Sequence, residues 1–150
     1  MFSCSQANNQ LAELVTLDDR DTGDVFILSG LYPTEGSRSD KWRWGTGQTS
    51  SLYFYMDKPG IVIISGTFEN PHTGQTVRFS LNGKELVTLS NLPKNEDKAA
   101  PLTFNMEGMA NQGRNILEIS YSHWTGNTGS TSTDTRNFSV KYRKLTITTR

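Results

Sequence analysis

The sequence predicts an all-β domain, an antiparallel β-sandwich of the jelly-roll type with eight to nine strands. Apolar runs rich in β-branched and aromatic residues recur about every ten to fifteen residues, as short strands do. Pro-Gly, Asn-Gly and other turn-forming pairs separate these runs. No stretch shows the apolar period of a convincing amphipathic helix, so strands are the main element expected.

Length and charge narrow the classes of protein that fit. The chain has 150 residues, and we expect a tail at residues 1–10 and a single domain over residues 11–150. Its 15 basic and 15 acidic residues argue against nonspecific binding to nucleic acid or to an anionic membrane surface. No apolar run approaches the length of about 20 residues that spans a membrane.

The single cysteine, Cys4, excludes an internal disulfide and, taken alone, a zinc site. It lies in Met-Phe-Ser-Cys-Ser-Gln, which resembles the end of a bacterial lipoprotein signal. An incidental thiol in a terminal tail is the simpler interpretation of the same residues.

The first half of the chain predicts three strands after an ambiguous start. Residues 11–17 alternate weakly and fit either a strand or one helical turn, and residues 25–28 predict a strand. Residues 30–45 read as a long loop of aromatic and charged side chains. Residues 52–56 form a strand that a Pro-Gly turn ends, and the β-branched run 61–68 predicts a central strand.

A hairpin is the clearest local signal. Residues 76–81 alternate strictly, with three apolar residues on one face, and residues 84–89 return after Asn82-Gly83. Asn-Gly favours a type I′ turn because both of its central residues need a positive φ.

The C-terminal part predicts the remaining strands, at residues 102–106, 115–121 and from 138 onward. Residues 125–137, rich in Gly, Ser and Thr, predict a long loop. The apolar face changes between Tyr142 and Leu145, which predicts a β-bulge.

The strand at 52–56 has two different faces. Leu52, Phe54 and Met56 form the better core face. Tyr53 and Tyr55 lie on the other face, where they would offer aromatic area to another protein or domain.

Four motifs follow one another in a recognisable order. They are Glu35…Arg43-Trp44, Val-Arg-Phe-Ser-Leu-Asn-Gly-Lys-Glu-Leu at 77–86, Asn-Ile-Leu-Glu-Ile at 115–119, and Asp134…Arg136 before a closing strand. Over residues 25–148 this order resembles the galactose-binding-domain-like β-sandwiches. It is similar in particular to carbohydrate-binding modules and to the accessory domains beside bacterial cell-envelope glycosyltransferases.

The resemblance implies sugar binding more often than catalysis. It also implies that the hairpin at 77–86 is structural, that Arg43 pairs with Glu35 inside the domain, and that one structural calcium can lie near a strand connection. The sequence departs from the pattern at residues 37–41, which read as an insertion before Arg43-Trp44.

A sugar site needs flat aromatic faces beside convergent polar groups. Two long loops supply both, and in a jelly roll these loops can lie at the same end. The candidate ligand-binding residues are Tyr32, Glu35, Arg38, Trp42 and Arg43 in the first loop and His123, Trp124, Asn127 and Arg136 around the last. The structural alternative is that Trp44 faces the core while Trp42 is exposed, with Trp124 open to either role.

Four acids around a glycine, Asp18, Asp19, Asp21 and Asp24, would suit a structural Ca²⁺. An acidic turn without metal is the alternative interpretation. No other cofactor is indicated.

Catalytic constellations are not evident. The two histidines, His72 and His123, lie near no Gly-x-Ser-x-Gly elbow, and His72 is expected to be a solvent-exposed turn residue. A glycosidase needs two facing carboxylates, which the sequence alone cannot pair. The acids available are Glu35, Asp40, Glu69, Glu107 and Asp134.

These observations predict a non-catalytic carbohydrate-binding module located outside the cytoplasm, whether periplasmic, secreted or surface-anchored, in or beside a bacterial cell envelope. Its expected partners are a carbohydrate and another domain or protein of the envelope, with no nucleic acid. The alternative is an assembly or accessory domain that has no sugar site of its own.

Overall fold

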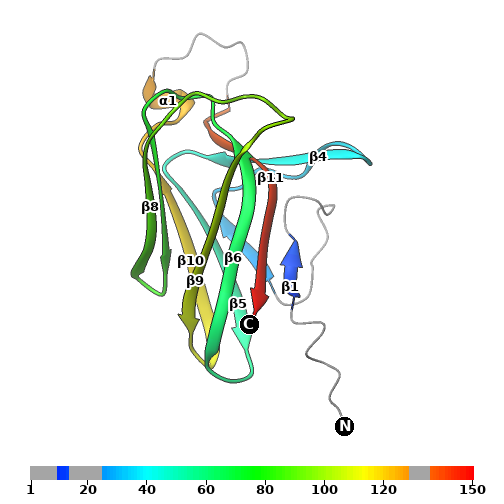
Figure 1. Cartoon of the computed structure of the whole chain (residues 1–150), viewed down its shortest axis with the longest axis vertical. Coiled ribbons are helices and arrows are strands. Elements are labelled where there is room, and N and C mark those ends of the chain that lie inside the picture. Colours follow the sequence, from blue (N-terminus) through cyan, green and yellow to red (C-terminus); the bar gives the residue numbers. More distant parts are fainter. Residues whose placement is uncertain (1–9, 14–24, 129–135) are drawn as a thin grey trace.

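The computed structural model describes residues 10–13, 25–128 and 136–150, and within them the chain forms two antiparallel sheets packed face to face (Figure 1). The elements are β1 (Gln10–Glu13), β2 (Val25–Ser29), β3 (Glu35–Ser37), β4 (Asp40–Thr46), β5 (Thr49–Met56), β6 (Gly60–Glu69), β7 (Gln75–Leu81), β8 (Lys84–Leu92), β9 (Leu102–Ala110), β10 (Gly113–Tyr121), α1 (Thr125–Thr128) and β11 (Phe138–Thr149). The predicted all-β sandwich is confirmed. No helix in these described ranges is long and apolar enough to cross a membrane.

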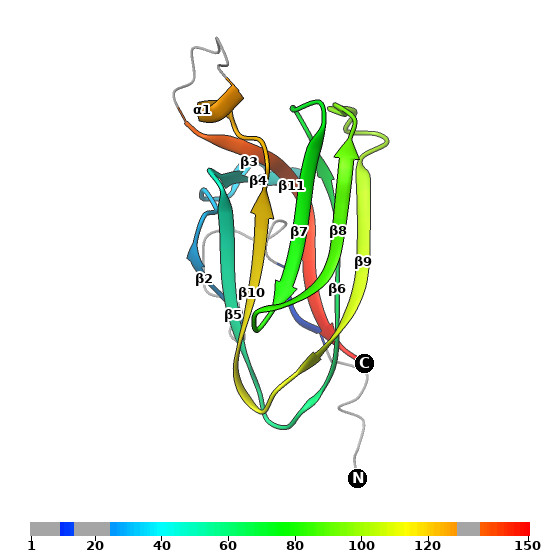
Figure 2. The ribbon, with the colours of Figure 1, turned by 90° about the vertical axis from the view of Figure 1, so that its left-hand side faces the viewer.

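One sheet has six strands in the order β3-β4-β11-β6-β9, with β1 paired to β11, and the other has five in the order β2-β5-β10-β7-β8. Strand β6, the β-branched run, lies between β11 and β9, so the prediction of a central strand is confirmed. In Figure 2 the five-stranded sheet faces the viewer, with β7, β8 and β10 in front of β6 and β11.

Alternating side chains of both sheets fill the space between them. The buried apolar core consists of Val25, Leu52, Phe54, Val62, Ile64, Phe68, Val77, Phe79, Leu81, Phe104, Met106, Ala110, Leu117, Ile119, Tyr121, Val140, Tyr142, Leu145 and Ile147. Leu52 and Phe54 are fully buried, Met56 packs against them, and Tyr55 on the opposite face is 51% exposed. The two faces predicted for this strand are therefore confirmed.

Two local predictions are also confirmed. Asn82 and Gly83 adopt φ values of 53° and 84°, as a type I′ hairpin requires. The register between β11 and β6 shifts between Tyr142 and Lys144, where the bulge was expected. Gly66 faces this bulge, and a Cβ there would collide with the backbone of Lys144, so the close approach of the two strands requires glycine.

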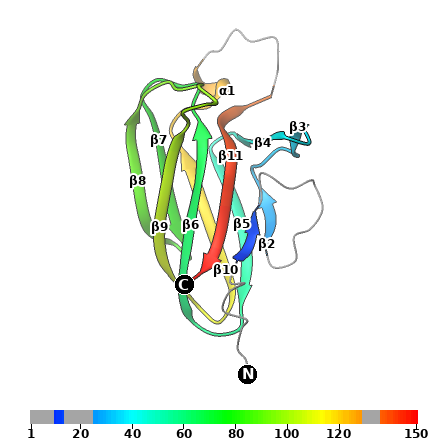
Figure 3. The same cartoon turned by 45° about the vertical axis from the view of Figure 1, so that its right-hand side comes forward.

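The prediction of a loop at residues 30–45 is wrong. Residues from Glu35 onward form the hairpin β3–β4, in which Glu35 pairs with Trp42 and Ser37 with Asp40. This hairpin, which we call the arm, projects sideways from the sandwich in two views (Figure 1, Figure 3). With β1 it raises the number of strands above the eight or nine expected. Strand β4 was not predicted because charged residues alternate with its tryptophans, so neither face of the strand has the apolar pattern of a core face.

Candidate functional site

The two long segments predicted to carry ligand-binding residues meet at one end of the sandwich. Arg136 donates two hydrogen bonds to the Glu35 carboxylate, at 2.8 and 3.3 Å, across 101 positions of sequence. The Tyr32 hydroxyl accepts a hydrogen bond from the backbone N–H of Asn137 at 3.2 Å. The structure thus brings together Tyr32, Glu35 and Arg136, three of the predicted residues, from two segments that are far apart in the sequence.

An aromatic wall stands beside this ion pair. The Phe138 ring lies 4.3 Å from the Trp44 ring and 6.1 Å from the Tyr32 ring, measured between centroids. The Arg136 guanidinium lies over both Phe138 and Tyr32, at 4.6 and 5.2 Å from their centroids. We call Tyr32, Glu35, Trp44, Arg136 and Phe138 the loop-end cluster.

Phe138 was not among the predicted site residues. Its alternation with Val140 and Tyr142 suggested a core position, and those two residues are indeed fully buried. A register shift between β11 and β4 after Phe138 breaks the alternation, however, and the ring packs half-buried against Trp44. The only sequence signal was the position of Phe138 beside Arg136, at the end of the long loop.

The prediction that Trp42 is exposed while Trp44 faces the core is wrong. Both indoles are half-buried on one face of β4, and Arg43 between them points inward and is 6% exposed. Residues two apart in a strand share a face, so the two tryptophans could not separate. Arg43 therefore lies away from the surface that carries Tyr32, and the salt bridge of Glu35 described above is made by Arg136.

The Trp42 ring is packed between Gly36 of the other arm strand and two cations. A Cβ on Gly36 would lie 2.6 Å from the Trp42 ring, so the ring rests directly on the glycine backbone. The Lys141 Nζ and the Arg143 guanidinium lie 4.3 and 5.1 Å from the Trp42 centroid. Burial lowers the pKa of Lys141 below its ordinary value, with a smaller contribution from Arg143. These contacts leave Trp42 less available to a sugar than Tyr32.

A salt-bridge network connects the arm to strands β11 and β6 and to Lys98. Arg143 binds the Glu69 carboxylate at 2.6 Å and the Asp40 carboxylate at 2.5 Å, and Lys98 binds Asp40 at 2.9 Å. The hydrogen bond from Lys98 is the main cause that holds the pKa of Asp40 below its ordinary value. Asp40 and Glu69 are therefore salt-bridge partners that position the arm.

The remaining predicted residues are not shown in contact with the loop-end cluster. Arg38 is exposed at the tip of the arm, and Trp124 is half-buried beside Gly126 at the start of α1. The His123 Nδ1 is 2.7 Å from the Ser122 Oγ. The side chain of Asn127 and the proposed calcium ligands Asp18, Asp19, Asp21 and Asp24 lie outside the described residues.

Buried Gln75 sets the position of the segment that carries His123. Its amide nitrogen donates to the His123 carbonyl at 2.7 Å, and its oxygen accepts from the N–H groups of Ser122 and His123. An unsatisfied buried amide would cost about 1–3 kcal/mol, so this full set of bonds fixes the start of the loop.

The expectation that His72 is solvent-exposed is wrong. The residue is 9% exposed, and its Nε2 lies 2.9 Å from the Phe138 carbonyl oxygen. A neutral ring can donate to that carbonyl, so His72 supports the backbone that carries the cluster. Among the described residues no group of three or more His, Cys, Asp or Glu is placed to hold a metal ion.

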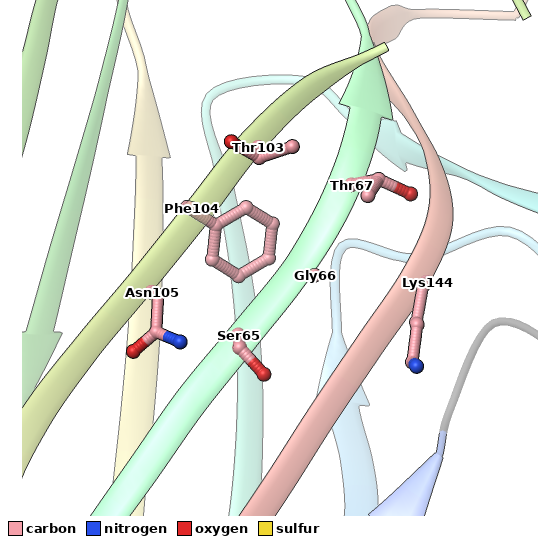
Figure 4. Close-up of a pocket in the computed structure, with 7 residues that line it drawn as sticks. All are labelled: Ser65, Gly66, Thr67, Thr103, Phe104, Asn105 and Lys144. Carbon is pink, nitrogen blue, oxygen red and sulfur yellow. The ribbon is translucent and has the colours of Figure 1, made fainter. Parts of the chain in front are cut away.

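A shallow groove lies on the outer face of the six-stranded sheet (Figure 4). Its volume is about 420 Å³, and it is lined by Ser65, Gly66, Thr67, Thr103, Phe104, Asn105 and Lys144. The hydroxyl and amide groups suit a polar ligand, but Phe104 is only 5% exposed. The groove therefore lacks the accessible aromatic wall that the loop-end cluster has.

No protein-family model and no curated protein sequence matches the chain. Solved structures share its fold. A family 6 carbohydrate-binding module of Cellvibrio mixtus lichenase 5A, in complex with cellotriose, has a TM-score of 0.51 at 12% identity and covers 93% of this chain and 97% of that one. A family 35 module from Clostridium thermocellum has a TM-score of 0.51 at 13% identity, with 92% and 98% covered.

Some matched chains are much longer. The chain spans 19% of a ruminal GH26 endo-β-1,4-mannanase and 28% of an exo-β-1,3-galactanase from Phanerochaete chrysosporium, at TM-scores of 0.49 and 0.45. The C-terminal family 6 module of a laminarinase from Zobellia galactanivorans is again matched over almost its whole length, 98%, with a TM-score of 0.51 and 10% identity. The domain therefore has the β-sandwich fold of these carbohydrate-binding modules.

Proposed function

We propose that this domain is a non-catalytic carbohydrate-binding module and that the loop-end cluster holds the sugar. One observation carries the proposal: an aromatic wall and a bidentate Arg–Glu pair from segments far apart in sequence meet at one end of the sandwich. Apolar rings beside a few convergent polar groups are the general form of a small-molecule site.

The cluster offers each kind of contact that a pyranose needs. The ring of Tyr32 can pack against the C–H face of a sugar, since aromatic side chains combine large apolar area with a polar end. The side chains of Arg136 and Glu35 are 36% and 29% exposed, so both can exchange hydrogen bonds with hydroxyl groups. Because each holds the other in place, the site is ordered before a ligand arrives.

The acids once considered for catalysis have other roles. Glu35, Asp40, Glu69 and Glu107 each bind a basic side chain in salt bridges. A glycosidase needs two carboxyl groups that face each other across a cleft, whereas these four are engaged with basic side chains. This supports the proposal of binding without catalysis.

The proposed setting is extracytoplasmic, in or beside a bacterial envelope, where the domain would stand next to another domain or protein. The acidic turn at Asp18, Asp19, Asp21 and Asp24 remains the proposed site for a structural Ca²⁺. Its test is a comparison of glycan binding with calcium and with a chelator.

The experiment that tests the function is a glycan-array screen of the intact chain, followed by titration of the best ligand. Tyr32→Ala and Arg136→Gln are each expected to weaken binding about tenfold, because each removes one contact of about 1.4 kcal/mol. Tyr55→Ala is the control, since it removes an exposed tyrosine from the outer face of the other sheet. Wild-type affinity in both cluster variants would show that the sugar binds elsewhere.

A second candidate function, docking of another protein or domain, is favoured by the outer face of the five-stranded sheet. There the rings of Phe26 and Tyr53 stack at 5.0 Å, Tyr55 meets Tyr53 edge-on, and Ile116 is 38% exposed. Exposed aromatic and aliphatic groups of this kind serve as anchors in protein interfaces. An array without a single bound glycan, with or without calcium, would move the proposal to this alternative.

A further inference from the structure

Lys141 lies on β11, between strand β4 of the arm and strand β6. In the strand register it lies opposite Trp44 of β4 and Glu69 of β6. Its Nζ lies 4.3 Å from the Trp42 ring centroid and 5.7 Å from that of Trp44. The side chain is half-buried, so its ammonium group has lost part of its hydration while remaining within reach of solvent.

The acids near Lys141 are already bound by other cations. Arg143 forms salt bridges with Glu69 and Asp40. Arg136 donates two hydrogen bonds to Glu35. Among the described residues no carboxylate lies within salt-bridge distance of Lys141 itself.

Among the described residues around Lys141, basic side chains therefore outnumber acidic ones. Lys98 shares Asp40 with Arg143, and the arm adds Arg38 and Lys41 without a further acid in its described residues. The domain as a whole has no net charge, with 15 basic and 15 acidic residues. An excess of cations on one neutral domain attracts an anionic ligand to that surface.

We propose that Lys141 selects a glycan that carries an anionic group, a carboxylate or a sulfate, and binds that group beside Trp42 and Trp44. This inference rests on the proposed function, because it extends the same site by one contact. Trp44 provides the continuity: its ring centroid lies 4.3 Å from that of Phe138 in the loop-end cluster and 5.7 Å from the Lys141 Nζ. A sugar held by the cluster could therefore place a charged substituent at Lys141.

The chemistry favours an anion over a neutral hydroxyl group. A hydrogen bond between an ammonium and an anionic oxygen is roughly twice as strong as one between neutral groups. An ammonium group has three N–H donors, and those that do not point at the ring face can reach a ligand. The pKa of Lys141, which burial lowers, would be raised again by a bound anion.

The test uses an array that holds each glycan in neutral, uronate and sulfated form, followed by titration of the best-bound set. Acidic forms should bind about tenfold or more tightly than their neutral counterparts, and the preference should shrink at high salt. The uronate and sulfate arms show which anion the site takes. Lys141→Met should abolish the preference, and Lys141→Arg should retain it.

Lys84→Met is the matched control, because it removes the same charge at the Asn82-Gly83 turn of the β7–β8 hairpin. If neutral glycans bind as tightly as acidic ones, or if Lys141→Met keeps the preference, the inference fails while the proposed function stands. If Lys84→Met also loses the preference, net charge and not Lys141 is responsible, and the inference fails. If no glycan of any form binds, the proposed function fails, and this inference fails with it.

Discussion

His72 links a turn of the sandwich to the backbone of the candidate site. Its Nε2 lies 2.9 Å from the carbonyl oxygen of Phe138, and Asn70 holds the turn through hydrogen bonds to His72 and to the Pro93 carbonyl. Because the ring is buried, the charged imidazolium is disfavoured, and the pKa of His72 falls below its ordinary value of 6.5. At neutral pH the ring is therefore uncharged and can donate to Phe138.

This lowered pKa predicts a pH dependence of folding stability. As the pH falls below 6.5, the unfolded chain takes up the proton on His72 before the folded chain does, so the free energy of unfolding decreases. His72→Gln keeps a donor but cannot titrate, and its stability should change less between pH 7 and about 5. Urea unfolding at several pH values measures both proteins. Equal slopes in the two would contradict the assignment.

At the scale of elements, the arm is held to the sandwich by charged groups. Strand β4 pairs with β11, and Arg143 of β11 reaches both Asp40 of the arm and Glu69 of β6. The Arg143–Glu69 salt bridge is more buried than the Lys98–Asp40 salt bridge. The Arg143 and Glu69 side chains are 13% and 6% exposed, whereas the Lys98 side chain is 63% exposed. Because Arg143 is the more buried cation, its salt bridges should contribute far more to folding stability than that of the exposed Lys98.

The prediction is a contrast between two substitutions. Arg143→Met leaves the buried Glu69 carboxylate without its ion-pair partner and should cost about 3 kcal/mol of unfolding free energy. Lys98→Met removes an exposed partner and should cost less than about 1 kcal/mol. Urea unfolding at pH 7 measures both, with far-ultraviolet circular dichroism as the check on the fold. A loss below about 1 kcal/mol in both variants would mean that Arg143 does not anchor the arm.

At the scale of the whole molecule, a buried pair of hydroxyl groups joins the two sheets. Tyr121 of β10 and Tyr142 of β11 lie 2.7 Å apart at their oxygens, and Tyr121 also bonds Ser50 of β5 at 2.8 Å. Burial raises the pKa of Tyr121 to about 12 and that of Tyr142 well above its ordinary value, so both stay neutral. Polar groups in this core specify how the sheets align near the candidate site.

The two tyrosines should differ in their effect on stability. Tyr142→Phe removes one hydrogen bond but leaves Tyr121 bonded to Ser50, and should cost about 0.5–1.5 kcal/mol. Tyr121→Phe leaves the buried Tyr142 hydroxyl unsatisfied and should cost about 1–3 kcal/mol. The double variant should cost less than the sum of the two, because no hydroxyl is then stranded. Chemical unfolding of the three variants gives a double-mutant cycle. If the losses in unfolding free energy simply add, the two hydroxyl groups are not coupled.

Prediction from sequence succeeded where the signal was local and failed where it depended on pairing. The face of Leu52 and Phe54 follows from side-chain alternation alone. Tyr32, Glu35 and Arg136 were selected for the site because of their chemistry, and the structure places them together. The role of Lys141 could not be predicted from the sequence, because a lysine in a strand is common. Its position beside Trp42 and Trp44 of another strand depends on the pairing of β4 with β11.

The fold class, the central strand, the Asn82-Gly83 turn and the bulge after Tyr142 could be predicted from the sequence, because alternation and turn chemistry act between near neighbours. That Arg136 is the residue that binds Glu35 could be seen only in the folded structure. The same is true of the burial of His72 under Phe138. Such contacts depend on which strands become neighbours in a sheet, and that choice is made by the packing of the whole sandwich.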